Sequence, residues 1–261
     1  IDRLQGAVYP LGRVLPSQAM QEFNLRRESV ELTQKLRDNR AGLFSNANLL
    51  DGMAQVNGFY SLWLPHFADM YWQLFDGPLR YQDKLADFVG ITCANTLKGP
   101  ELWLERPTAL PLVTVGRRPV FRELETTAEY FNTQEFDPSE MVYLPIGTEA
   151  VFPEGRVIDA RVSELDIKPH QIRFRITSSA ATVATIAQTH FHWWQAEVDG
   201  QRVPIHLANR AFQAVPVPEG EHVVILRYVD WGFRIGALIS LSTLAGCIFF
   251  LRRRIVPAQR T

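Results

Sequence analysis

The end of the chain constrains its folding more than any other segment does. Residues 235–251 are seventeen consecutive residues without a charge, and Arg252, Arg253 and Arg254 follow them directly. A helix of that length spans about 25 Å, close to the roughly 30 Å of a bilayer's hydrocarbon core. A buried core helix is the alternative interpretation, but arginines directly after the apolar run favour a membrane anchor. We therefore predict one transmembrane helix over residues 234–254.

The charges that flank this helix also predict how the chain crosses the membrane. Arginines gather on the cytoplasmic side of a span, so we expect residues 255–261 to form a cytoplasmic tail and the bulk of the chain to be periplasmic. Trp231 and the three arginines are the expected anchors at the two membrane boundaries. The predicted location is thus a bacterial inner membrane. Because Ile1 is not an initiating methionine and begins no signal peptide, we expect an upstream segment to carry the chain across.

Small and hydroxyl-bearing residues recur within the predicted span. The four that we select are Gly236, Ser240, Thr243 and Gly246. Small side chains let a second helix approach closely, and hydroxyl groups can bond to helix carbonyls. We therefore predict that a partner helix binds this face, which makes other membrane-protein subunits expected partners besides the bilayer.

Composition indicates a folded protein that does not bind nucleic acid. The 261 residues are 46% hydrophobic and 21% charged, with a net charge of -1. That charge gives no electrostatic reason for nucleic-acid binding. Cys93 lies in the soluble part and Cys247 in the apolar run, so a disulfide between them is implausible. Zinc-type Cys-x-x-Cys spacing is absent from the sequence.

The hydrophobic periodicity changes between Pro145 and Gly155. Before this point, helical segments alternate with short apolar strands, which predicts an extracytoplasmic α/β lobe over residues 1–145. After it, residues 156–230 contain β-branched or alternating segments and tight turns such as Asp199-Gly200, which predict an antiparallel β-sandwich. The expected class is α+β: an N-terminal α/β lobe, a β-sandwich and one C-terminal transmembrane helix.

Three histidines form a candidate metal site. His190 and His192 are two residues apart and would share one face of a strand, where His206 could supply a third ligand to zinc or copper. Histidines beside Trp193 and Trp194 more often serve in packing or at an interface. We therefore predict no bound metal and no cofactor.

Aromatic residues form a second candidate site. Phe191, Trp193 and Trp194 lie close together in the sequence, and their ring faces could stack on a sugar. Packing inside the β-sandwich is the favoured alternative. We keep these residues as a candidate contact surface, with a glycan as a candidate partner.

Catalytic motifs are not recognisable in the chain. It has no Gly-x-Ser-x-Gly, no phosphate-binding glycine loop and no cysteine placed with His and Asn as a nucleophile requires. Carboxylate pairs such as Glu123 and Glu125 are better interpreted as surface charges. We therefore expect this chain itself not to catalyse a reaction.

The segment from Trp194 to Tyr228 is followed in the chain by Phe233-Arg-Ile-Gly and the apolar run. Together these parts resemble the C-terminal end of YfhO-type bacterial membrane proteins. The resemblance is most specific over residues 155–254, with weaker similarity at 52–64, 85–92 and 105–111. This family is related to GT-C-type glycosyltransferases, which use a lipid-phosphate sugar donor on the outer membrane face. The resemblance implies an extracytoplasmic region and a last helix, and it places no family catalytic residue in this sequence.

Two functions follow from these observations. In the first, the chain is a non-catalytic, membrane-anchored periplasmic subunit that packs on and stabilises a larger respiratory, photosynthetic or envelope-assembly complex. In the second, it is the acceptor-orienting C-terminal part of a lipid-linked-sugar-dependent GT-C-type glycosyltransferase whose membrane core is absent from this sequence. We favour the first interpretation, because the chain contains a complete tether and lacks a catalytic constellation.

Overall fold

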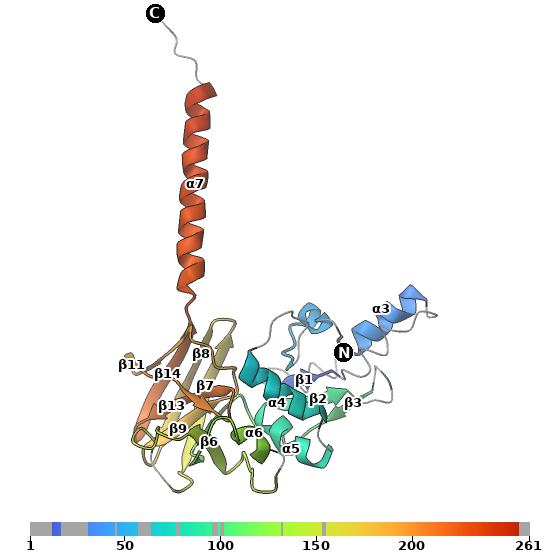
Figure 1. The fold of residues 1–261 in the computed structure, drawn as a ribbon, viewed down its shortest axis with the longest axis vertical. Helices are drawn as coiled ribbons and strands as arrows, with labels where there is room; N and C mark the ends of the chain where they lie inside the picture. The colour runs from blue at the N-terminus through green and yellow to red at the C-terminus, as the bar shows by residue number, and fades with distance from the viewer. Residues whose placement is uncertain are drawn as a thin grey trace, which may run out of the picture.

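A β-rich body, a helical part beside it and one long helix that stands away from both make up the fold (Figure 1). The computed structural model describes residues 12–16, 31–44, 46–56, 64–76, 79–95, 99, 102–131, 133–152 and 155–255. Within them, the predicted α+β class with an antiparallel β-sandwich and a C-terminal helix is confirmed.

The β-sandwich is built from two antiparallel sheets. The first has the strand order β11-β10-β14-β8-β7 and comprises β7 (Ala160–Lys168), β8 (Gln171–Ser178), β10 (Trp194–Val198), β11 (Gln201–Val203) and β14 (Gly220–Tyr228). The second has the order β12-β13-β9-β4 and comprises β4 (Val113–Val115), β9 (Thr182–Ile186), β12 (His206–Ala208) and β13 (Phe212–Val217). Alternate residues along β8, such as Phe174, face the second sheet and share one hydrophobic core with Ile186 and Val215.

The second sheet is covered on both faces. Ala184 of β9 belongs to the core between the sheets, whereas its neighbour Val183 packs on the other side with Val142. Val142 lies on β6 (Met141–Pro145), which pairs in parallel with β5 (Arg118–Arg122), and α6 (Thr127–Tyr130) connects them. Strand β4 precedes Pro145 in the sequence and still pairs with β9. The division into lobes at residues 1–145 and 156–230 stays a prediction.

The helical part surrounds a small mixed sheet. Its strands are β1 (Arg13–Leu15), β2 (Ile91–Asn95) and β3 (Trp103–Glu105), and its helices are α3 (Leu32–Ala41), η1 (Ala47–Asp51), α4 (Pro65–Asp76) and α5 (Leu79–Phe88). Strand β1 runs parallel to β2, and β3 runs antiparallel to it. The ring of Phe88 meets that of Phe212 edge to face at 4.9 Å between centroids, so the helical part shares its core with the β-sandwich.

The C-terminal helix α7 (Trp231–Ile255) confirms the predicted apolar span. Its segment Trp231–Leu251, 21 residues long, is long and apolar enough to cross a bilayer, and none of it is buried by the rest of the described chain. The side chains of Arg252–Arg254 and the predicted tail beyond Ile255 lie outside the described residues. The orientation of the helix across a membrane therefore stays a prediction.

Candidate functional site at the base of the membrane helix

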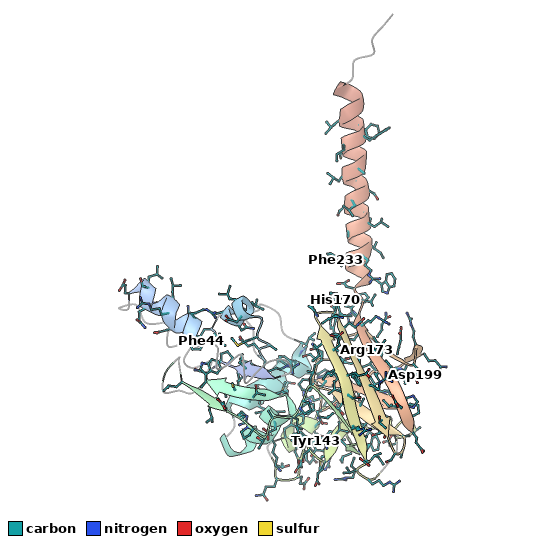
Figure 2. All side chains as sticks on the ribbon, turned by 180° about the vertical axis from the view of Figure 1, so that it is seen from behind. Phe44, Tyr143, His170, Arg173, Asp199 and Phe233 are labelled. Atoms are coloured by element: carbon teal, nitrogen blue, oxygen red, sulfur yellow. The ribbon has the colours of Figure 1, made fainter. Side chains whose placement is uncertain are left out.

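Strand β14 continues into α7 almost without interruption. Only Val229 and Asp230 separate them. The amide of Val229 donates a hydrogen bond to the carbonyl of Trp193 (2.9 Å), and Asp230 Oδ1 accepts one from the amide of Phe233 (2.8 Å). The second bond caps the first turn of the helix. The β-sandwich and the helix are thus joined by hydrogen-bonded structure, and Phe233 and His170 both lie at this junction in Figure 2.

The predicted aromatic surface lies at this same junction. Phe191 and Trp193 belong to the loop between β9 and β10, and Trp194 begins β10 beside the end of β14. All three are half-buried. The ring of Tyr228 stacks with Phe191 at 6.3 Å and meets Trp194 edge-on at 5.6 Å between centroids. These rings therefore form a partly exposed cluster beside the first turn of α7. In membrane proteins, aromatic residues concentrate at the ends of the spans.

Of the three candidate metal ligands, His190 and His192 lie in the same loop as Phe191 and Trp193, and His206 begins β12. Burial lowers the pKa of His190 first, and the nearby charges of His192, His206 and His66 lower it further. Burial also lowers the pKa of His206, whose ring meets Phe152 edge to face at 5.2 Å. In the described part of the chain, no group of three or more His, Cys, Asp and Glu side chains could hold a metal ion. The histidines are neighbours without the arrangement of a metal centre.

The four residues of the predicted partner face lie along one side of α7. Their spacing of four, three and three residues places Gly236, Ser240, Thr243 and Gly246 on one helical stripe. Thr243 Oγ1 donates to the carbonyl of Ile239 at 2.9 Å, which satisfies the hydroxyl within the helix. A side chain added at either glycine would meet no described atom within 4 Å. This stripe is open to a neighbouring helix or to lipid.

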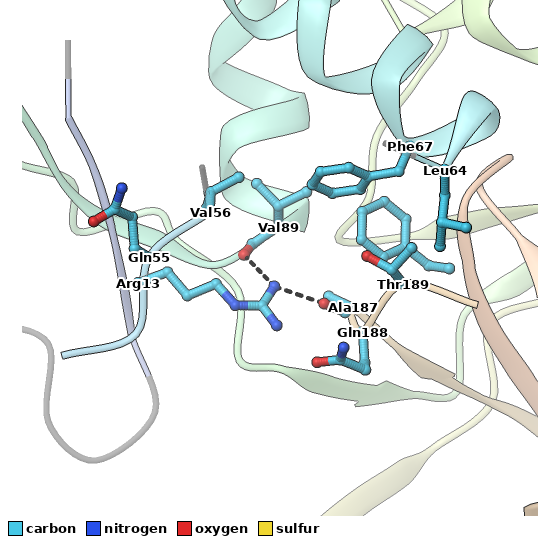
Figure 3. A pocket seen from close by; sticks show the side chains of 10 residues that line it. Arg13, Gln55, Val56, Leu64, Phe67, Val89, Ala187, Gln188 and Thr189 are labelled. Carbon is cyan, nitrogen blue, oxygen red and sulfur yellow. Dashed lines mark hydrogen bonds between the residues drawn. The ribbon is translucent and has the colours of Figure 1, made fainter. Parts of the chain in front are cut away.

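The structure also contains a cleft that the sequence interpretation missed. It has a volume of about 360 Å³ and lies where β1 and α4 meet the loop between β9 and β10. The residues that line it are Arg13, Gln55, Val56, Leu64, Phe67, Val89, Ala187, Gln188, Thr189 and Phe212. Figure 3 shows the guanidinium of Arg13 extended across the cleft toward Ala187 and Gln188. An arginine at the start of a short apolar strand was the available signal, and its hydrogen-bond partners Val89 and Ala187 are far away in the sequence.

Arg13 joins the helical part to the β-sandwich. Its Nη1 donates to the carbonyl of Val89 at 3.1 Å and to that of Ala187 at 2.6 Å. Burial lowers the pKa of Arg13 to about 10, so the guanidinium stays protonated at neutral pH. The cleft therefore carries a fixed positive charge.

An apolar helix that emerges directly from a β-sandwich defines the class of protein: a membrane protein with a β-sandwich next to its span. Residues 160–240 match the family model described as Bacterial membrane protein YfhO. The match begins at the first residue of β7 and ends within α7. It confirms the resemblance to the C-terminal region of YfhO-type proteins over these residues. None of the curated proteins matches the chain.

Proposed function

We propose that this chain is a non-catalytic, membrane-anchored module whose β-sandwich lies directly on the periplasmic surface of a bacterial inner membrane. The observation that carries the proposal is the junction between β14 and α7. The link is only two residues long, Val229 is hydrogen-bonded to Trp193 of the body, and Asp230 caps α7, so we expect the body to be held close to its anchor. A body fixed in this way is suited to packing against a larger membrane assembly and stabilising it.

The two ends of α7 support this orientation. Trp231 and the aromatic cluster of Phe191, Trp193 and Trp194 lie at the end beside the β-sandwich, where interfacial aromatic side chains are common. The guanidinium of Arg234 lies 5.1 Å from the centre of the Trp231 ring, so a cation–π contact lies at the same level. The arginines at the other end favour the cytoplasmic side by the positive-inside rule.

A partner helix on the stripe of Gly236, Ser240, Thr243 and Gly246 would complete the module. Helices associate in membranes through close packing at small residues, and this stripe faces no described part of the chain. The expected partners are other membrane-protein subunits.

The test is purification of the complex in mild detergent with a matched pair of variants. Gly246→Leu enlarges a small residue within the stripe, and Ala245→Leu enlarges a small residue of the same turn that lies outside the stripe. We expect Gly246→Leu to reduce co-purification of partner subunits at least about tenfold and Ala245→Leu to leave it unchanged. Equal co-purification with both variants would exclude this stripe as the contact.

A second candidate function is favoured by the family match. Because residues 160–240 match the YfhO family, the chain is also a candidate for the acceptor-orienting part of a GT-C-type glycosyltransferase. In that function, Trp193 and Phe191 would stack on a pyranose of the acceptor. Saturation-transfer NMR with short oligosaccharides tests this directly. Loss of the signal in Trp193→Ala would support glycan binding, and no signal with the unsubstituted protein would contradict it.

A further inference from the structure

The guanidinium of Arg13 has more hydrogen-bond donors than the protein uses. A guanidinium carries five N–H groups. Within the described residues, only Nη1 donates, and both of its acceptors are main-chain carbonyls, of Val89 and Ala187. The two bonds explain how Arg13 holds the helical part against the β-sandwich. Among the described residues, they leave the donors of Nε and Nη2 without an acceptor.

The positive charge of Arg13 is not paired with a carboxylate in the described part of the chain. Several other half-buried arginines are paired with a carboxylate, such as Arg106 with Asp87 at 2.7 Å and Arg227 with Glu197 at 2.6 Å. Carbonyl dipoles offset only part of the cost of removing a charge from water. Arg13 is thus a cation beside a cavity whose neutralising anion is not supplied by the described protein.

The other walls of the cleft fit a ligand with an apolar body. Phe67 and Leu64 line the side opposite the guanidinium (Figure 3). Phe212 also lines the cleft. Gln188 and Thr189 add polar groups to the lining of the cleft. A volume of about 360 Å³ is within the range of small-molecule sites, which are mostly apolar with a few placed polar groups.

The cleft also borders the membrane-proximal loop. Ala187, Gln188 and Thr189 line it, and the same loop continues to Trp193, whose carbonyl accepts the hydrogen bond from Val229 at the base of α7. One loop therefore joins the lining of the cleft to the base of α7.

We propose that this cleft binds a small amphiphilic anion, with a carboxylate or phosphate group on Arg13 and an apolar chain against Phe67 and Phe212. Charge-assisted bonds from a guanidinium to such oxygens are short and strong, and the planar donor group matches both anions. The inference concerns a ligand site and goes beyond the proposed anchoring function. It holds whether or not a partner helix binds α7.

Calorimetric titration of the full chain in nonionic detergent tests the proposal. The probes are hexyl phosphate, hexanoate, hexanol and inorganic phosphate. We expect at least one hexyl anion to bind about tenfold or more tightly than hexanol and than inorganic phosphate. Hexanol binding as tightly as both hexyl anions would overturn the role of the charge. Inorganic phosphate binding as tightly as hexyl phosphate and hexanoate would overturn the role of the apolar wall.

Three variants locate the binding. Arg13→Met should remove the preference for the anions over hexanol, whereas Arg156→Met, at an exposed arginine outside the cleft, should preserve it. Leu64→Trp fills the cleft and leaves Arg13 in place, so it should weaken binding of the hexyl anions about tenfold even if Arg13→Met fails to fold. Unchanged anion binding in Leu64→Trp would overturn the proposal.

A competition arm separates the two sources of such an anion. Displacement of the bound hexyl anion by phosphatidic acid in mixed micelles would support binding of a membrane lipid head group. Retention of the bound hexyl anion would support a soluble acid of the same chemistry. The competition is measured with the unsubstituted protein and with Arg156→Met, because both have an intact cleft.

Discussion

Asn209 is a single residue that fastens β6 to the β-sandwich. Its backbone lies in the left-handed region (φ 42°), which asparagine adopts more readily than most residues do. In this conformation Asn209 makes two hydrogen bonds to the backbone of Tyr143. Its side-chain Oδ1 accepts from the backbone N–H of Tyr143, and its backbone N–H donates to the carbonyl of Tyr143, both at 2.8 Å. Asn209 is 1% exposed, so water cannot replace these bonds.

We predict that Asn209→Ala lowers the free energy of unfolding by about 1–3 kcal/mol. The substitution leaves the buried amide of Tyr143 without its acceptor, and alanine tolerates the left-handed conformation less well. Chemical denaturation of the full chain in detergent measures the change, with Gln201→Ala on an exposed strand as the control. If Asn209→Ala lowers the free energy of unfolding no more than the control does, the two hydrogen bonds of Asn209 contribute little to stability.

At the scale of elements, the turn between β10 and β11 is tied to β14. Asp199 Oδ2 lies 2.6 Å from His222 Nδ1, and Asp199 Oδ1 accepts from the amide of Val223 at 2.8 Å. The hydrogen bond from His222 lowers the pKa of Asp199, and Asp199 in turn raises the pKa of His222. One pair therefore fixes a hairpin turn against the strand that leads to α7.

The directions of these shifts predict how the contribution of the pair depends on pH. The raised pKa of His222 gives stability that is fully present below its ordinary value of 6.5 and is lost as the pH rises through the raised value. The lowered pKa of Asp199 gives stability that is present above its ordinary value of 3.8 and is lost as the pH falls through the lowered value. The pair therefore contributes most between these ordinary values, by less than about 1 kcal/mol because it is solvent-accessible.

We predict that His222→Ala destabilises the protein more at pH 5 than at pH 9. Denaturation of both proteins at the two pH values measures the difference, and Asp199→Asn should show the same trend because it removes the charged partner. His170→Ala, at an exposed histidine in the turn between β7 and β8, serves as the control. If His222→Ala lowers the free energy of unfolding equally at both pH values, an ionic contribution of the pair is contradicted.

At the scale of the whole molecule, local patterns predicted the elements, and long-range contacts determined the sites. The uncharged run of residues 235–251 and the alternation along β8 depend only on neighbours in sequence, so the helix and the antiparallel sheets could be predicted. The pairing of β4 with β9 and the bond from Arg13 to Ala187 join distant segments. No local hydrophobic pattern in the sequence indicates these two long-range contacts. The cleft was missed for this reason.

The candidate sites were partly predictable for the same reason. The aromatic residues Phe191, Trp193 and Trp194 could be selected from the sequence, but their place beside α7 depends on the pairing of β10 with β14. His190, His192 and His206 were recognised as potential ligands, yet their side chains do not form a metal-binding group in the described structure. Residue type indicated the chemistry, and the sheet register decided the arrangement.

The orientation of the β-sandwich at the membrane is the central claim, and cysteine labelling tests it most directly. Glu219 is exposed in the turn before β14, at the end of that strand opposite α7. The two native cysteines interfere little, because Cys93 is buried and Cys247 lies within the apolar span. In intact spheroplasts that carry the protein in their inner membrane, we predict that a membrane-impermeant maleimide labels Glu219→Cys. Labelling only after the membrane is permeabilised would place the β-sandwich in the cytoplasm and contradict this account.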